Sequence, residues 1–168
     1  MSEVKTFILT HDEIERKLQR MAWEIYENNH LTSRLILIGI ADNGFHLATA
    51  ISKILVEISG KEIITGRIDF NKPDGFNASP VLDCAVSLHN ETVIMVDDVL
   101  NSGKTMLVAM LPVLNNKPSK LQTAVLANRN HKAFPVKGDI VGISLATTLQ
   151  EHIWFQIDGN QKMSIYLD

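Results

Sequence analysis

The sequence lacks several features that would point to other classes of protein. Its 168 residues include a single cysteine, Cys84, which excludes an internal disulfide and therefore a disulfide framework. No apolar run approaches the roughly 20 residues that a transmembrane helix needs. The first residues, Met-Ser-Glu-Val-Lys, show no signal-peptide pattern. We therefore expect a cytoplasmic protein without a membrane partner.

The net charge and the spacing of the histidines bear on two classes of ligand, nucleic acids and metal ions. A formal net charge of −3 gives no overall attraction for nucleic acid, although a local basic patch is still compatible with it. The six histidines show no metal-ligand spacing. The length and the 45% hydrophobic composition fit one globular domain, which we take to span residues 1–168.

Strand-like and helix-like patterns alternate along the chain. Thr10 and Glu13 form a capping-box pattern before the first helix, and Pro112 should stop or kink the last helix. Alternation places Arg67 and Asp69 on one face of a strand. Strands are expected at 4–9, 35–40, 63–70, 93–96, 121–127, 139–145, 153–157 and 163–167, helices at 45–58 and 104–111, a tight turn at 39–44 and a loop at 71–80. This order predicts an α/β fold with a mostly parallel sheet covered by helices, and an antiparallel tail.

The stretch from residue 92 to residue 105 carries the strongest functional signal. A run of buried, β-branched residues ends in two adjacent carboxylates, Asp97 and Asp98, and a short polar loop leads into a helix at Lys104. The start of a helix offers backbone N–H groups and a positive dipole end to a phosphate. The carboxylates cannot bind that phosphate, so they would serve sugar hydroxyls or Mg2+. The combination suggests a sugar-phosphate ligand.

Two alternatives to this interpretation are weaker. Gly103-Lys104-Thr105 is also found at the end of a P-loop, but that motif needs a glycine where this chain has Asp98, so a nucleoside triphosphatase is disfavoured. The second alternative is that the two acids simply end a strand and cap the next helix. Adjacent strand residues point to opposite sides, so both acids seldom serve as caps, and a functional role is preferred.

The sequence Val-Asp-Asp-Val-Leu-Asn-Ser-Gly-Lys-Thr at 96–105 resembles the phosphoribosyl pyrophosphate signature of type I phosphoribosyltransferases. The segments 37–40, 66–69, 121–126 and 129–135 extend the resemblance, in order and spacing, to the bifunctional pyrimidine-operon attenuator/uracil phosphoribosyltransferase branch. The resemblance implies a mostly parallel central sheet flanked by helices with a small antiparallel hood. It also implies a homodimer or higher homo-oligomer.

The resemblance assigns roles to residues that match the family pattern. Asp97 and Asp98 would be catalytic residues that bind the ribose hydroxyls, with Mg2+ held indirectly through those hydroxyls or water. Lys72 would act from the loop at 71–80. The remaining substrate-binding residues would be Asn101, Ser102, Gly103, Lys104 and Thr105 around the 5-phosphate, Ala41, Asp42, Asn43 and Gly44 near pyrophosphate, and Arg129 near the base.

The reaction implied is attack of a nucleobase nitrogen on the anomeric carbon of phosphoribosyl pyrophosphate, with pyrophosphate leaving. Members that act on 6-oxopurines usually carry an aspartate at the position of Asn101. An amide is neither an acid nor a base near neutral pH. The resemblance therefore favours a pyrimidine such as uracil.

The chain departs from the family at the pyrophosphate end. The segment Ala41 to Gly44 lacks the usual basic and hydroxyl residues, and Asp42 would repel pyrophosphate unless it holds the metal or points away. The loop at 71–80 is short and offers only Lys72 and Asp74. A nucleotide-sensing regulator of pyrimidine metabolism with little or no catalysis is therefore kept as the alternative to the transferase.

RNA binding is the less supported part of that alternative. The branch uses polar and basic positions on its first helix and after its fifth strand. Arg16, Lys17 and Arg20 lie near the first set here, and Arg129 and Lys132 keep the basic character of the second. RNA is therefore a possible partner beside the nucleobase and the nucleoside monophosphate.

Overall fold

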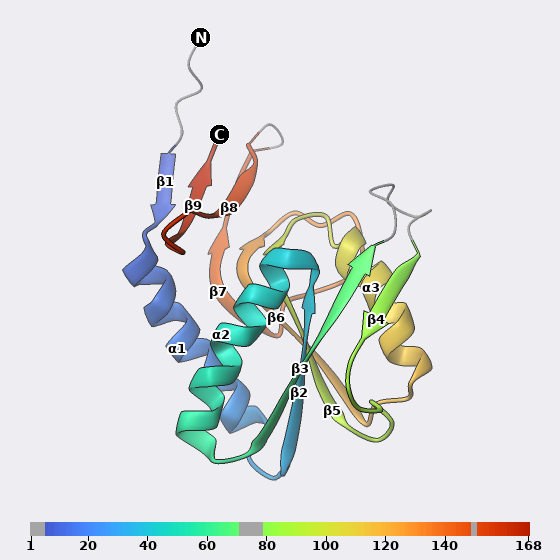
Figure 1. Cartoon of the computed structure of the whole chain (residues 1–168). Helices are drawn as coiled ribbons and strands as arrows, with labels where there is room; N and C mark the ends of the chain where they lie inside the picture. The colour runs from blue at the N-terminus through green and yellow to red at the C-terminus, as the bar shows by residue number, and fades with distance from the viewer. Residues whose placement is uncertain (1–5, 71–78, 149–150) are drawn as a thin grey trace.

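The computed structural model describes residues 6–70, 79–148 and 151–168. A central sheet lies between helices, and a smaller sheet stands at one end of it (Figure 1). The elements in chain order are β1 (Thr6–Leu9), α1 (His11–Asn28), β2 (Arg34–Ile40), α2 (Ala41–Ser59), β3 (Glu62–Phe70), β4 (Pro80–Asp83), β5 (Thr92–Leu100), α3 (Lys104–Asn115), β6 (Lys120–Arg129), β7 (Ile140–Leu145), β8 (Ile153–Ile157) and β9 (Met163–Leu167).

The central sheet has the strand order β4-β3-β2-β5-β6-β7. Every neighbouring pair is parallel except β3 and β4. The small sheet, of order β1-β9-β8, is antiparallel. The predicted architecture is confirmed. Because parallel strands end at one edge, the residues that close β2, β3, β5 and β6 are brought together there, which is where ligands bind in open α/β sheets.

The uninterrupted apolar runs are explained by burial of both faces of the sheet. On β2, Leu35 and Leu37 belong to the cluster that packs against α1 and α2, whereas Ile36 and Ile38 belong to the cluster that packs against α3. All four side chains are buried. A strand covered on both faces needs apolar residues at every position rather than at alternate ones.

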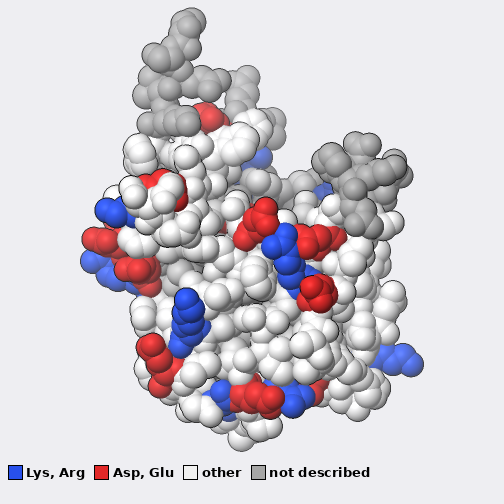
Figure 2. Space-filling model, in the orientation of Figure 1, with Lys and Arg blue, Asp and Glu red and all other residues white. Residues whose placement is uncertain are grey.

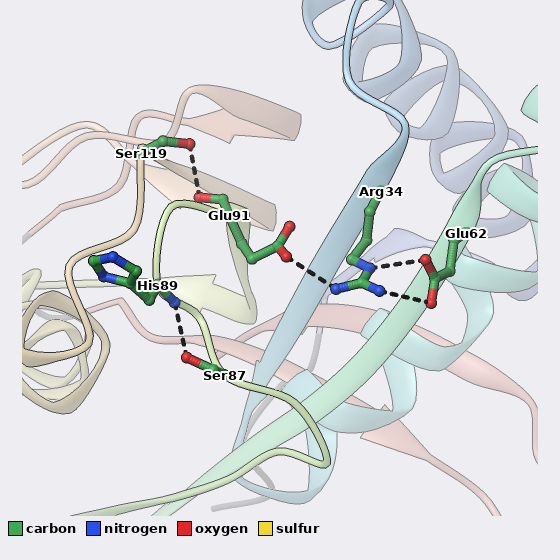
Figure 3. A network of polar contacts seen from close by, with 6 residues as sticks. All are labelled: Arg34, Glu62, Ser87, His89, Glu91 and Ser119. Carbon is green, nitrogen blue, oxygen red and sulfur yellow. Dashed lines mark hydrogen bonds and ion pairs between the residues drawn. The ribbon is translucent and has the colours of Figure 1, made fainter.

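An ion-pair network joins the amino-terminal ends of three strands of the central sheet, opposite the edge where the parallel strands end. Figure 3 shows Arg34, at the start of β2, between Glu62 of β3 and Glu91, which precedes β5. Its Nε and Nη2 atoms donate to the two Glu62 carboxylate oxygens at 2.8 and 3.2 Å, and Nη1 donates to Glu91 at 2.9 Å. These hydrogen bonds raise the pKa of Arg34. The network joins the beginnings of three neighbouring strands, far along the sheet from their carboxyl ends.

The first helix follows its sequence pattern closely. The Glu13 carboxylate accepts hydrogen bonds from both the backbone N–H and the hydroxyl of Thr10, each at 2.8 Å, so the predicted capping box is confirmed. These bonds lower the pKa of Glu13.

No helix in the described ranges of the chain is both long enough and apolar enough to cross a membrane.

The junction between β2 and α2 differs from the prediction. The tight turn expected at 39–44 is absent, because α2 begins at Ala41, directly after the strand, rather than at Phe45. Ala41 itself makes the change of direction with a φ of 52°. A Cβ at Gly39 would lie 2.3 Å from the Phe45 Cα, so the helix packs onto the end of its own strand. Residues with a turn-like composition are thus the first turn of a helix.

Two other boundaries were placed too early. The strand predicted at 93–96 extends through both aspartates to Leu100, because β6 pairs with it as far as Leu100 and Asn128. The helix expected to stop or kink at Pro112 continues to Asn115, so the prediction of a stop was wrong. Proline removes one backbone donor, but the buried Val113 keeps the last turn packed on the core.

Candidate functional site

A cavity of about 440 Å3 lies at the carboxyl edge of the central sheet. The end of β5, the following loop, and the first turns of α2 and α3 form its walls. The lining residues are Ile40, Ala41, Asp42, Asn43, Phe70, Asp97, Asp98, Val99, Leu100, Asn101, Ser102, Gly103, Lys104, Thr105 and Met106. Of the predicted site residues that the structure describes, all except Gly44 and Arg129 are therefore brought together.

Asp97 is the deepest charged group in this cavity. Its side chain is buried, and Oδ1 accepts the backbone N–H of Asp98 at 2.9 Å. Burial, followed by the charge of Asp98, raises the pKa of the Asp97 carboxyl well above its ordinary value. A raised pKa favours the protonated carboxyl, which can donate a hydrogen bond to a hydroxyl group.

Asp98 lies on the opposite face of β5 and has a different environment. It is half-buried, and its two carboxylate oxygens accept separate hydrogen bonds. Oδ1 accepts the N–H of Val99 at 2.7 Å, and Oδ2 accepts the side-chain amide of Asn43 at 2.8 Å. The carboxylate is thus fixed in direction while it lines the cavity.

The loop at 101–103 brings the start of α3 to the cavity. Gly103 is the N-cap residue with a φ of 87°, a conformation that favours glycine, and it has no side chain of its own to cap the helix, while Ser102 Oγ accepts the Lys104 N–H at 3.3 Å. The first turn of α3 carries no acidic residue, so its positive dipole end is available to an anion. The carbonyl of Ser102 accepts the N–H groups of Ala133 and Phe134 at 3.1 and 3.0 Å, which ties this loop to the segment after β6.

An arginine between two acids lies beside the first turn of α2. Arg67 donates to Asp42 at 2.8 Å through Nη2 and to Asp69 at 2.5 and 2.6 Å through Nε and Nη2. These contacts raise the pKa of Arg67 and lower the pKa of Asp69. The prediction that Arg67 and Asp69 share a face is confirmed. The Arg67–Asp42 ion pair also shows the orientation of Asp42: its carboxylate, which is 90% exposed, points toward Arg67.

This arrangement leaves the first turn of α2 without a cation of its own. None of residues 41–44 carries a positive charge, and Arg67 is shared by two carboxylates. Among the described residues that line the cavity, Lys104 supplies the positive charge. A larger groove of about 940 Å3 between α1 and α2 shares Asp42 with the site and includes Arg67.

Two predicted site residues lie outside the cavity lining, and a third lies outside the described residues. Gly44 is buried, and a Cβ there would lie 2.6 Å from the Val96 carbonyl oxygen, so the residue allows helix and strand to meet. Arg129 lies outside the cavity lining and donates to Thr147 Oγ1 and to the Thr148 carbonyl, each at 2.7 Å. Lys72 lies outside the described residues, so its role stays a prediction.

Sequence patterns missed two features of the site. Phe70, the last residue of β3, lines the cavity, and only its position just before a loop could have marked it. The hydrogen bond from Asn43 to Asp98 spans 55 positions of the chain. No local pattern signals a contact of that separation.

The side chains available as metal ligands decide whether the cavity is suited to bind Mg2+. In the described parts of the chain, no group of three or more His, Cys, Asp or Glu residues is arranged to hold a metal ion. Mg2+ is commonly held by one or two carboxylates together with substrate phosphates and water. Asp98 is the accessible carboxylate for this purpose, whereas Asp97 favours its protonated form. The residues fit a metal held mainly by the substrate.

Among the basic residues of α1, Arg20 is held by contacts within the chain. Arg20 donates to the Val141 and Gly142 carbonyls at 2.8 and 2.7 Å and pairs with Glu24 at 2.6 Å. On the face shown in Figure 2, acidic and basic side chains are interspersed rather than gathered by sign. This face therefore lacks the extended basic surface typical of nucleic-acid binding.

A family profile described as the phosphoribosyl transferase domain matches residues 6–158. The match covers the central sheet, both aspartates and the phosphate-type loop. The chain belongs to the phosphoribosyltransferase family, and the resemblance seen in the sequence is confirmed.

Curated relatives named Bifunctional protein PyrR are similar to the chain over nearly its whole length. The Bacillus pumilus protein is 33% identical over 179 aligned residues, with 98% of each chain covered. The Geobacter sulfurreducens protein is 35% identical over 172 residues, with 97% of each chain covered. These similarities support the attenuator/uracil phosphoribosyltransferase branch named from the sequence.

Solved structures confirm the fold of the type I phosphoribosyltransferases. A Trypanosoma cruzi hypoxanthine phosphoribosyl transferase has a TM-score of 0.75 at 18% identity, covering 84% of this chain and 78% of that one. A Bacillus anthracis hypoxanthine-guanine phosphoribosyltransferase has a TM-score of 0.73 at 17% identity, covering 88% and 84%. At these identities the likeness concerns the fold, not the substrate.

Proposed function

We propose that the chain transfers ribose 5-phosphate from phosphoribosyl pyrophosphate to a pyrimidine such as uracil. The observation that carries this proposal is the meeting of Asp97, Asp98 and the loop at 101–105 in one cavity. Hydroxyl-binding acids beside an unblocked helix start match the two ends of a ribose 5-phosphate. Membership of the phosphoribosyltransferase family supports the same reaction class.

The residues would divide the work between sugar and phosphate. Asp97 and Asp98 would form hydrogen bonds with the two ribose hydroxyls. The backbone N–H groups at the start of α3 and the hydroxyls of Ser102 and Thr105 would bind the 5-phosphate. When bound, Mg2+ would neutralise charge on the departing pyrophosphate. The protein would act mainly by orienting the anomeric carbon toward the base.

The test is formation of nucleotide and pyrophosphate. The chain is incubated with phosphoribosyl pyrophosphate, Mg2+ and each of uracil, cytosine, orotate and hypoxanthine, and both products are quantified. We expect turnover with uracil and none with hypoxanthine. The double variant Asp97→Asn/Asp98→Asn should abolish it, while Asp158→Asn in the turn between β8 and β9 should not. Turnover with hypoxanthine alone would contradict the assignment of the base.

A second candidate function is a nucleotide-sensing regulator with little catalysis. The observation that favours it is the pairing of Arg67 with Asp42 and Asp69, which leaves residues 41–44 without a free cation for pyrophosphate. The name of the relatives, Bifunctional protein PyrR, is consistent with a second function. Binding of uridine monophosphate or RNA in titrations, without any product from phosphoribosyl pyrophosphate, would favour this candidate over the transferase.

We also propose a homodimer or higher homo-oligomer, as the family resemblance implies. Sedimentation velocity over a range of protein concentrations measures the state directly. A monomer at every concentration would contradict this part of the proposal.

A further inference from the structure

The first turn of α2 reaches across the cavity to β5 through one side chain. The Asn43 amide nitrogen donates to Asp98 Oδ2 at 2.8 Å, and the contact is partly buried. Alternation along β5 explains the meeting. Val96 belongs to the core cluster on the face that α2 covers, so Asp98, two residues on, points toward the same helix.

The backbone gives Asn43 little freedom to lie elsewhere. Ala41 turns the chain from β2 into α2 within one residue, at a φ of 52°. Gly39 and Gly44 allow the helix to touch β2 and β5, because a Cβ at either position would lie 2.3 or 2.6 Å from backbone atoms. Asn43 lies between Gly39 and Gly44 in the sequence, so the packing at both glycines fixes the position from which its side chain extends.

The amide of Asn43 orients the carboxylate without neutralising it. Asp98 Oδ2 accepts the Asn43 amide and Oδ1 accepts the Val99 N–H, and an ionised carboxylate has about four lone-pair sites, so it can also accept from a ligand. A lysine or arginine in this position would share the charge, as Arg67 does with Asp42.

We infer that Asn43 is a positioning residue that holds Asp98 in the orientation required to accept ribose hydroxyls. The inference rests on the proposed binding of ribose 5-phosphate. It assigns the Asn43 side chain to the sugar end of the site, rather than to pyrophosphate. The first turn of α2 therefore contributes to recognition of the ribose.

Calorimetry with ligands that differ in their hydroxyls separates this role from a structural one. Ribose 5-phosphate, 2-deoxyribose 5-phosphate and inorganic phosphate are titrated into the native chain, Asn43→Ala and Asn43→Asp. The aspartate variant places a like charge against Asp98. We expect at least a tenfold loss of ribose 5-phosphate affinity for Asn43→Asp, a smaller loss for Asn43→Ala, and inorganic phosphate affinity unchanged within twofold for both. The control is Asn160→Asp, in the turn between β8 and β9.

The affinity for 2-deoxyribose 5-phosphate should fall less than that for ribose 5-phosphate. An equal loss for inorganic phosphate would mean that the variants disturb the whole cavity, and this would overturn the positioning role. Unchanged ribose 5-phosphate affinity would overturn it as well.

A ligand-free measurement distinguishes failure of this inference from failure of the proposed function. Unfolding of Asn43→Ala, Asp98→Ala and the double variant forms a double-mutant cycle, and paired residues should give non-additive free energies. Additive effects would overturn the pairing alone. A native chain that fails to bind ribose 5-phosphate would overturn the proposed function, and with it the ligand assigned to Asp98.

Discussion

Replacing Gly44 by alanine should damage both the stability and the sugar end of the site. The added Cβ would lie 2.6 Å from the Val96 carbonyl oxygen and 3.5 Å from the Asp97 Cα. Both are backbone atoms, so no side-chain rotation relieves the contact, and overpacking of this kind costs about 2–3 kcal/mol. The higher helix propensity of alanine offsets about 1 kcal/mol. The net loss expected is about 1–2 kcal/mol.

The variant should also weaken ribose 5-phosphate binding, because α2 must move away from β5 and carry Asn43 with it. Urea unfolding measures the stability through the midpoint at constant slope, and calorimetry measures the affinity. Gly60→Ala is the matched control at the other end of the same helix. Gly60 has a φ of 62° and no neighbouring atom within 4 Å of a built Cβ, so alanine there costs about 1 kcal/mol of backbone strain and should leave affinity unchanged.

Two results would refute this reasoning. If Gly44→Ala were as stable as the native chain, the close packing of α2 on β5 would be wrong. If Gly60→Ala lowered the affinity as much as Gly44→Ala, the loss would follow from general destabilisation rather than from displacement of the first turn of α2.

Three further predictions concern charged groups. The folded chain raises the pKa of Asp97 above its ordinary value of 3.8, so its contribution to stability is present at low pH and is lost as the pH rises toward the raised pKa. Asp97→Asn should therefore become more stable relative to the native chain as the pH rises above about 4, and a Tm difference independent of pH would contradict this. Arg34→Gln should lower the unfolding midpoint in urea without changing phosphate affinity in calorimetry; a matching loss of affinity would show that the far edge of the sheet influences the site. Arg67→Ala leaves Asp42 and Asp69 unpaired, so pyrophosphate affinity should fall severalfold at low salt and converge with the native value at high salt. Arg67→Lys is the control, and a loss that does not depend on salt would exclude a charge effect.

The sequence was sufficient to predict the parts of the fold that depend on burial. Apolar runs such as Leu35 to Ile38 could be identified as strands because both faces of the sheet are covered. The acids and the loop at 101–105 could be placed at a site because residues adjacent in the chain also adjoin in the cavity. In both cases, the order of neighbouring residues in the sequence was sufficient for the prediction.

The remaining features depend on contacts between distant segments. Ala41 to Gly44 have the composition of a turn, yet they form a helix because Gly39 allows Phe45 to pack against the strand. Pro112 remains within α3 because the packing of Val113 outweighs one missing donor. The bond between Asn43 and Asp98 joins α2 to β5. Neither propensity nor periodicity specifies such contacts.

The direct passage from β2 into α2 also limits how this site can vary. A loop can gain or lose residues and still close, but here the strand ends at Ile40 and the helix begins at Ala41. An inserted residue would rotate α2 by about 100° and would turn Asn43 away from Asp98 and Asp42 away from Arg67. Variation in the first turn of α2 must therefore proceed by substitution within a fixed length. A graft of a longer loop from a related transferase would be expected to fail unless the whole helix were exchanged with it.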